Sequence, residues 1–196
     1  MSFLTVMELL PLVGAALIAT VNKDKEDAIK KMAFLTTLIV AVAGIALTLQ
    51  FDRNDAGLQF VEKHSWIPAF GINYAVGIDG IALVLILMSV ILAPIVVLAG
   101  WNEATGGRWS VKTFYILILV LETMMIGVFA ATDVFLFYVF FEAMLIPVYF
   151  LIGGYGTGQR AQAAVKFLLY SLLGGLLMLA AIIGLYVIAG SQVGRT

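Results

Sequence analysis

Two glutamates lie near the centres of long apolar segments, where their carboxyl groups could carry protons through a membrane. Glu142 lies in the run FYVFFEAMLIPVYFLIGG (137–154), and Glu122 lies in YILILVLETMMIGVFA (115–130). An acidic charge at the centre of a bilayer costs about 2.5–3.5 kcal/mol. Two such groups at one depth, in segments joined only by residues 132–133, are typical of a protein interior with bound water. They predict a proton relay; the alternative is two protonated carboxyls that only donate hydrogen bonds between helices.

Polar, aromatic or small residues recur at helical spacing on one face of each of the last three apolar segments. Such faces suit a hydrated path through a helix bundle, although aromatic faces are equally typical of ordinary packing. The three faces hold Tyr115 and Glu122; Tyr138, Glu142 and Tyr149; and Lys166, Tyr170 and Gly174.

Two further residues could modify the carboxyl groups. Pro147 lies five residues after Glu142, and a proline inside a helix frees the carbonyl four residues earlier, here that of Ala143. That carbonyl could order water beside Glu142. Lys166 lies about one turn inside the last segment, where it either anchors the helix at the membrane surface or tunes the protonation of a carboxyl group.

The remaining acidic residues of the apolar segments lie nearer to the segment ends. Asp79 and Asp133 lie where two segments begin, a position typical of helix N-caps. Asp79 is kept as a supporting residue of the candidate site. Glu8 lies about a third of the way into the first segment, and its position is ambiguous.

Composition indicates an integral membrane protein. Hydrophobic residues make up 63% of the 196 residues and charged residues only 12%, against about 25% charged residues in a typical soluble domain. Six segments approach the roughly 20 apolar residues needed to cross a bilayer. The predicted fold is an all-α membrane protein with a single multi-pass domain of residues 1–196. The predicted spans are residues 3–21, 32–50, 80–100, 113–131, 134–153 and 163–189.

The longest predicted connection comprises residues 51–78. Its aromatic residues Trp66, Phe70 and Tyr74 favour an anchor at the membrane surface, and a short paired strand or a contact with a partner is the alternative. His64 is expected at the surface of this connection rather than as a proton carrier.

Basic residues are unevenly distributed between the two ends of the predicted spans. Because cytoplasmic connections are enriched in Lys and Arg, the distribution predicts an N-terminus outside the cell and an extracytoplasmic 51–78 connection. The larger set, expected in the cytoplasm, is Lys23, Lys25, Lys30, Lys31, Arg108, Lys112, Arg160 and Lys166, and the smaller set is Arg53, Lys63 and Arg195.

The composition also excludes several classes of site. The chain has no Cys, which excludes disulfides, thiolate-bound zinc and iron–sulfur clusters. Its only histidine is His64, so it cannot form a multi-histidine metal site or a bis-histidine haem site. A net charge of −1 argues against a nucleic-acid partner. We therefore expect no catalytic redox residue, cofactor or metal in this chain.

Three motifs carry a resemblance to a known family. YAVGIDGIALVLILMSVILAP (74–94), FFEAMLIPVYFLIGGYG (140–156) and RAQAAVKFLLYSLLGGLLML (160–179) resemble the antiporter-like membrane subunits of respiratory complex I. The segment SWIPAFGINYAVGIDGIAL (65–83) favours the subunit M family, which includes mitochondrial subunit 4, over the related L and N subunits. Multisubunit sodium/proton antiporters contain similar subunits and are the alternative.

The resemblance implies a function and site residues. These subunits move protons, driven by electron transfer in other subunits. Glu142 matches the family's essential glutamate of the fifth helix, and Glu122 matches a second acidic position on the fourth. Lys166 matches a basic position on the sixth helix. The implied activity is that of a non-redox subunit of a proton-pumping NADH:quinone oxidoreductase.

The resemblance also implies partners and a location. The neighbours would be the lipid bilayer and the antiporter-like subunits L and N, in the bacterial inner (plasma) membrane. NADH, FMN, iron–sulfur clusters and quinone would bind to other subunits. Family members have about fourteen helices in two inverted repeats, against six spans here. The resemblance therefore implies an N-terminal fragment, and it places the lysine partner of Glu142 beyond residue 196.

Overall fold

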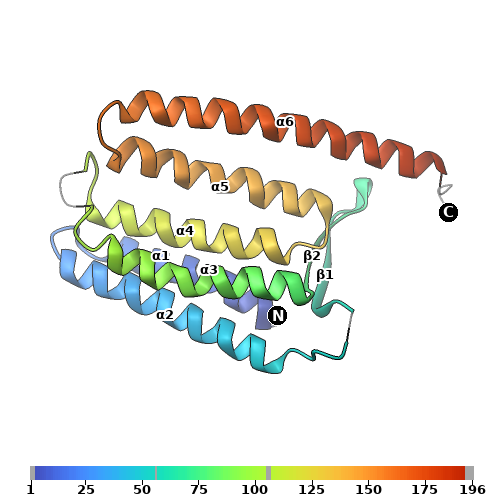
Figure 1. Ribbon diagram of the computed structural model, residues 1–196, viewed down its shortest axis with the longest axis horizontal. Coiled ribbons are helices and arrows are strands. Elements are labelled where there is room, and N and C mark those ends of the chain that lie inside the picture. Colours follow the sequence, from blue (N-terminus) through green and yellow to red (C-terminus); the bar gives the residue numbers. More distant parts are fainter. Residues whose placement is uncertain (1–2, 56, 105–106, 193–196) are drawn as a thin grey trace.

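Six long helices make up most of the fold in the computed structural model, which describes residues 3–55, 57–104 and 107–192 (Figure 1). All six are long and apolar enough to cross a membrane, which confirms the predicted all-α membrane class. Arg195 lies outside the described residues. The helices are α1 (Phe3–Thr20), α2 (Glu26–Gln50), α3 (Gly80–Ala99), α4 (Val111–Ala130), α5 (Val134–Tyr155) and α6 (Arg160–Gln192).

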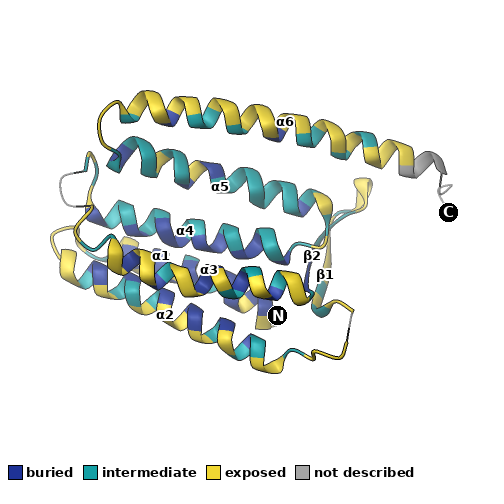
Figure 2. Ribbon diagram, in the orientation of Figure 1, coloured by how far each residue is buried: buried dark blue, intermediate teal, exposed yellow. Residues whose placement is uncertain are grey.

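Helix α4 lies at the centre of the bundle. It packs against α1, α2, α3 and α5, whereas α6 packs chiefly against α5. Most of the described side chains of α6 are therefore exposed, as its colouring in Figure 2 shows. The buried side chains of α4 recur at helical spacing along its length, so one broad face of the helix is buried from end to end.

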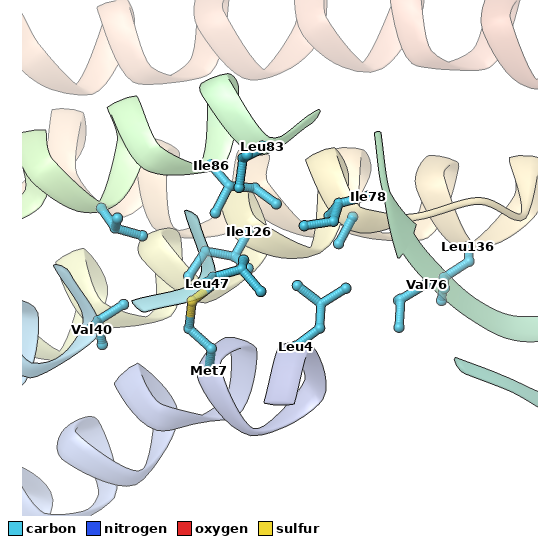
Figure 3. Packing of buried hydrophobic residues seen from close by; sticks show 12 residues of the cluster. Leu4, Met7, Val40, Leu47, Val76, Ile78, Leu83, Ile86, Ile126 and Leu136 are labelled. Carbon is cyan, nitrogen blue, oxygen red and sulfur yellow. The ribbon is translucent and has the colours of Figure 1, made fainter. Parts of the chain in front are cut away.

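Apolar side chains from α1 to α5 meet at the end of the bundle where the chain starts (Figure 3). Side chains of the strand β2 (Ile72–Ile78) complete this core, so the strand seals one end of the helix bundle. The labelled residues are Leu4, Met7, Val40, Leu47, Val76, Ile78, Leu83, Ile86, Ile126 and Leu136.

The 51–78 connection forms a β-hairpin. Strand β1 (Gln59–Ile67) pairs antiparallel with β2, and the short 3₁₀ helix η1 (Pro68–Phe70) connects the two strands. The alternative of a short paired strand is therefore the structure that forms. Trp66 and Phe70 stay exposed, as an aromatic anchor requires, but Tyr74 is partly buried against the bundle. His64 is exposed, as expected.

Two aspartates begin the helices that follow the hairpin and the α4–α5 turn. The Asp79 carboxylate accepts a hydrogen bond from the Ala82 N–H at 2.7 Å, which caps α3. The Asp133 carboxylate accepts from the N–H groups of Phe135 at 2.9 Å and Leu136 at 3.2 Å, which caps α5. The predicted capping interpretation is confirmed for both.

Asp133 also holds the hairpin. Its second carboxylate oxygen accepts from the Asn73 N–H of β2 at 3.0 Å, and the Thr132 N–H donates to the Ala75 carbonyl at 2.9 Å. The α4–α5 turn is thus fixed both to its own helix and to the strand beside it.

Replacing Asp133 by alanine is expected to lower the free energy of unfolding by about 1–2 kcal/mol, because the α5 cap and the Asn73 acceptor are lost together. Thermal unfolding in lipid or detergent measures the change. Asp133→Asn keeps an oxygen acceptor and should lose less. An unchanged midpoint for Asp133→Ala would contradict the assigned contacts.

Candidate proton-transfer site

The α4–α5 hairpin places Glu122 and Glu142 at the same depth. Glu122 lies eight residues before Ala130 at the end of α4, and Glu142 lies eight residues after Val134 at the start of α5. Each is therefore about 12 Å from the turn at 1.5 Å rise per residue. The structure therefore places the two carboxyl-bearing residues at one depth, as the sequence predicts.

Glu122 is a buried carboxyl group. Its side chain is 3% exposed. Among the described residues, neither of its carboxyl oxygens has a hydrogen-bond partner. Buried side-chain oxygens are nearly always hydrogen-bonded, and the exceptions are typical of functional sites. A fixed charge here would be expensive, so this group suits transient proton binding.

Glu142 lies where α5 meets α6. Its Oε1 atom is buried and, within the described chain, accepts no hydrogen bond. The carboxyl group lies so close to Gly175 of α6 that a Cβ at that position would overlap it. The absence of a side chain at residue 175 is therefore what gives the carboxyl group its place between the two helices.

A glycine also allows the close approach of α4 and α5. A Cβ at Gly127 would lie 2.7 Å from ring atoms of Phe140, which is too close for real atoms. Gly127 and Phe140 lie between the turn and the two carboxyl groups. The contact therefore brings the two glutamate-bearing helices together just below the site.

A tyrosine extends the polar face of α4. Tyr115 is fully buried, and its hydroxyl has no hydrogen-bond partner among the described residues. It shares a helical face with Glu122, seven residues later. The unpartnered polar groups of α4 thus follow one line, as the predicted polar face requires.

Tyr138 and Tyr149 of α5 are the two tyrosines predicted on the same helical face as Glu142. Tyr138 is close enough to the Glu142 carboxyl group for an electrostatic interaction. In the described chain, neither Tyr138 nor Tyr149 donates a hydrogen bond to it, and the Tyr149 ring packs edge-on against Phe150 at 5.3 Å. Pro147 is buried inside a helix that continues to Tyr155.

The structure does not bring the predicted α6 face to Glu142. Lys166 and Gly174 are exposed, and Tyr170 is 75% exposed. The face of α6 that meets α5 holds Ala164, Ser171 and Gly175 instead, because the packing follows the small residues. The sequence pattern indicates close helix packing at residues 174–175 but places Gly174, not Gly175, on the predicted polar face; the seven- and four-residue spacing of the small residues is the signal that selects Gly175. Asp79, capping α3, is not shown in contact with either glutamate.

Comparison with known proteins shows what the chain is similar to. Residues 131–194 match the family model described as NADH:quinone oxidoreductase/Mrp antiporter, TM. NADH-quinone oxidoreductase subunit M of Mycobacterium tuberculosis is 44% identical over 213 residues, covering 95% of this chain and 38% of that protein. The chain is homologous to part of subunit M. Subunit M of Rhodobacter capsulatus is 39% identical over 194 residues, covering 97% of this chain and 37% of that protein.

The homology to subunit M extends to the fold. A chain of respiratory complex I from Thermus thermophilus with bound NADH superposes with a TM-score of 0.81 at 28% identity, covering 96% of this chain and 37% of that chain. The chain thus spans a little more than a third of the length of the curated subunit M relatives that it matches. The family-model match includes all of α5 and α6, the two helices that enclose the Glu142 carboxyl group.

Proposed function

We propose that this chain is part of a proton-translocating membrane subunit of an NADH–quinone oxidoreductase, in which Glu122 and Glu142 bind and release protons. One observation carries the proposal: in the described chain, the Glu122 carboxyl oxygens and the buried Oε1 of Glu142 have no hydrogen-bond partner, and the two groups lie at the same depth on paired membrane-spanning helices. Homology to subunit M supports it, because those relatives are named as subunits of such enzymes.

The contribution of each residue follows from its surroundings. A proton bound at Glu122 or Glu142 removes a charge that the apolar surroundings disfavour, and its departure restores that charge. The pair can therefore pass a proton onward when the electrostatic potential around it changes. The Tyr115 hydroxyl on the same face of α4 is a donor and acceptor that can extend the path toward the other end of the helix.

Lys166 is proposed to act elsewhere. Its side chain is exposed on α6, so its charge is expected to influence a group outside this bundle rather than Glu142. Tyr170 shares that exposed face, and the same expectation applies to it.

The redox chemistry is assigned to other subunits. NADH, FMN, iron–sulfur clusters and quinone are proposed to bind there, and the antiporter-like subunits L and N are proposed as neighbours. The proposed location is the bacterial inner membrane with the N-terminus outside. Lys23, Lys25 and Arg108 lie in connections at one end of the helices, and Arg160 begins α6 at that end, which supports this orientation.

The proposal predicts that Glu122→Gln in the full-length subunit lowers quinone-coupled proton pumping by about tenfold or more, because glutamine keeps the shape but cannot exchange the proton. Proton uptake by membrane vesicles containing the whole complex measures the effect. Glu103→Gln is the matched control, since Glu103 is exposed in a connection. Normal pumping by Glu122→Gln would remove Glu122 from the path.

A subunit of a multisubunit sodium/proton antiporter is the second candidate, because the matching family model is named for both classes. The two differ in what accompanies the subunit. Co-purification with flavin and iron–sulfur subunits supports the oxidoreductase, and their consistent absence from an active transport complex supports the antiporter.

A further inference from the structure

A third buried glutamate lies outside the α4–α5 pair. Glu8 is 2% exposed and lies five residues after the start of α1. Its carboxylate accepts a hydrogen bond from the Tyr74 hydroxyl of β2 at 3.0 Å. The hairpin thus places a proton donor against a buried acid near one end of the bundle.

The contact with Tyr74 is one link in a longer chain of polar groups. The Tyr74 hydroxyl lies 3.3 Å from the Thr5 hydroxyl, and Thr5 donates to the carboxylate of Glu62 on β1. Glu62 is only partly buried, so the chain runs from a buried carboxyl to one within reach of water. Burial raises the pKa of Tyr74 to about 12, so its hydroxyl keeps its proton at neutral pH.

A cavity of about 360 Å³ adjoins this chain. It is lined on the hairpin side by Glu62, His64 and Tyr74, and on the helix side by Thr123 of α4 and Phe140 of α5. Thr123 follows Glu122 directly, and Phe140 lies two residues before Glu142. The cavity is large enough to hold water, and it lies between the Glu8 chain and the helices that carry the central pair.

We propose that Glu8 is a further proton-carrying residue and that the Tyr74 and Thr5 hydroxyls connect it to Glu62 and the aqueous phase at the hairpin end. This inference rests on the proposed proton-translocating function and deepens it. The inference identifies, within this chain, a route by which protons could exchange between the buried site and water.

The transfer balances without any other reactant. When Glu8 is protonated, the Tyr74 hydroxyl turns from Glu8 toward Thr5. The Glu8 carboxyl then gives its proton to the Tyr74 oxygen while Tyr74 gives its own hydroxyl proton to Thr5. Thr5 in turn gives its hydroxyl proton to the Glu62 carboxylate. Both hydroxyls end neutral, and the net change is one proton lost by Glu8 and one gained by Glu62. Glu62 then exchanges that proton with water.

The titratable groups near Glu8 come from the hairpin. Tyr74 lies on β2, and Glu62 and His64 lie on β1 along the wall of the cavity that Glu8 also lines. The exposed His64 ring stacks near Tyr74, with 6.5 Å between the ring centroids, but is not needed as a link. The two hydroxyls supply a continuous route without it.

The test is Glu8→Gln in the full-length subunit within its complex. The amide carbonyl can still accept from Tyr74, so a purely structural role is retained while proton exchange is lost. We expect proton pumping to fall about tenfold or more. Glu8→Asp is expected to restore a measurable part of it, and Tyr74→Phe to lower it as well. Glu26→Gln, at the exposed start of α2, is the matched control.

The outcomes separate this inference from the proposed function. If Glu142→Gln stops pumping and Glu8→Gln does not, the Glu8 route is overturned and the proposed function stands. If neither variant changes pumping, both are overturned. Should Glu8→Gln fail to assemble, infrared difference spectroscopy of the wild type and Glu8→Asp decides. A carboxylic-acid band that responds to turnover and shifts in Glu8→Asp supports the route, and an unresponsive band overturns it.

Discussion

Glu142→Gln in the full-length subunit is expected to reduce quinone-coupled proton pumping by at least about tenfold, the larger effect of the two central glutamates. The side chain lies between α5 and α6, with its buried Oε1 free of partners in the described chain. Glutamine has nearly the same size, so the helix contact is retained. Only the exchangeable proton is lost, and proton uptake by vesicles during quinone reduction measures that loss.

The control for this variant is Glu142→Asp. Aspartate keeps the acid but withdraws it by one methylene group, so part of the pumping should return. Amounts of assembled complex are compared for both variants, because a failure to assemble would also lower pumping. Near-normal pumping by assembled Glu142→Gln would exclude Glu142 as a proton carrier.

Gly175→Ala is expected to disable the same carboxyl group without changing it chemically. A methyl group at residue 175 would occupy the space of the Glu142 carboxyl, so either the carboxyl turns away or α6 moves off α5. Because small displacements of a reacting group can lower rates by about a hundredfold, we expect pumping to fall by about tenfold or more.

The neighbouring Gly174 supplies a matched control. A Cβ at residue 174 meets no atom within 4 Å, and the residue is exposed on the same helix. Alanine favours a helix over glycine by about 1 kcal/mol at either position, so any difference between Gly174→Ala and Gly175→Ala reflects contact with Glu142. Equal pumping by the two variants would show that the carboxyl group does not depend on the space at residue 175.

Local rules predicted much of the fold from the sequence. Asp79 and Asp133 were assigned as caps from their position before apolar runs, and the hydrogen bonds of both carboxylates agree. A cap depends on residues within one turn, so the local sequence is sufficient to predict it. The depth of Glu122 and Glu142 was similarly predictable, because a short turn and a fixed rise per residue determine it.

Contacts between distant segments were harder to predict. The register of α6 against α5 decides whether Gly174 or Gly175 meets Glu142, and a shift of one residue rotates a side chain by about 100°. The helical spacing of Lys166 and Tyr170 correctly places both residues on one face of α6. It does not show which neighbour that face meets. The bond from Tyr74 to Glu8 joins residues 66 positions apart, and no local pattern contains it.

The equal spacing of the two central glutamates from their shared turn has an evolutionary consequence. A one-residue insertion between Asp133 and Glu142 would shift the carboxyl by only about 1.5 Å along the axis but would rotate it by about 100°. It would then leave the seam with α6 while remaining at nearly the same depth. Insertions in this hairpin are therefore expected to be tolerated only in compensating sets that restore the helical phase. The segment 122–142 is accordingly expected to keep the same length among functional homologues.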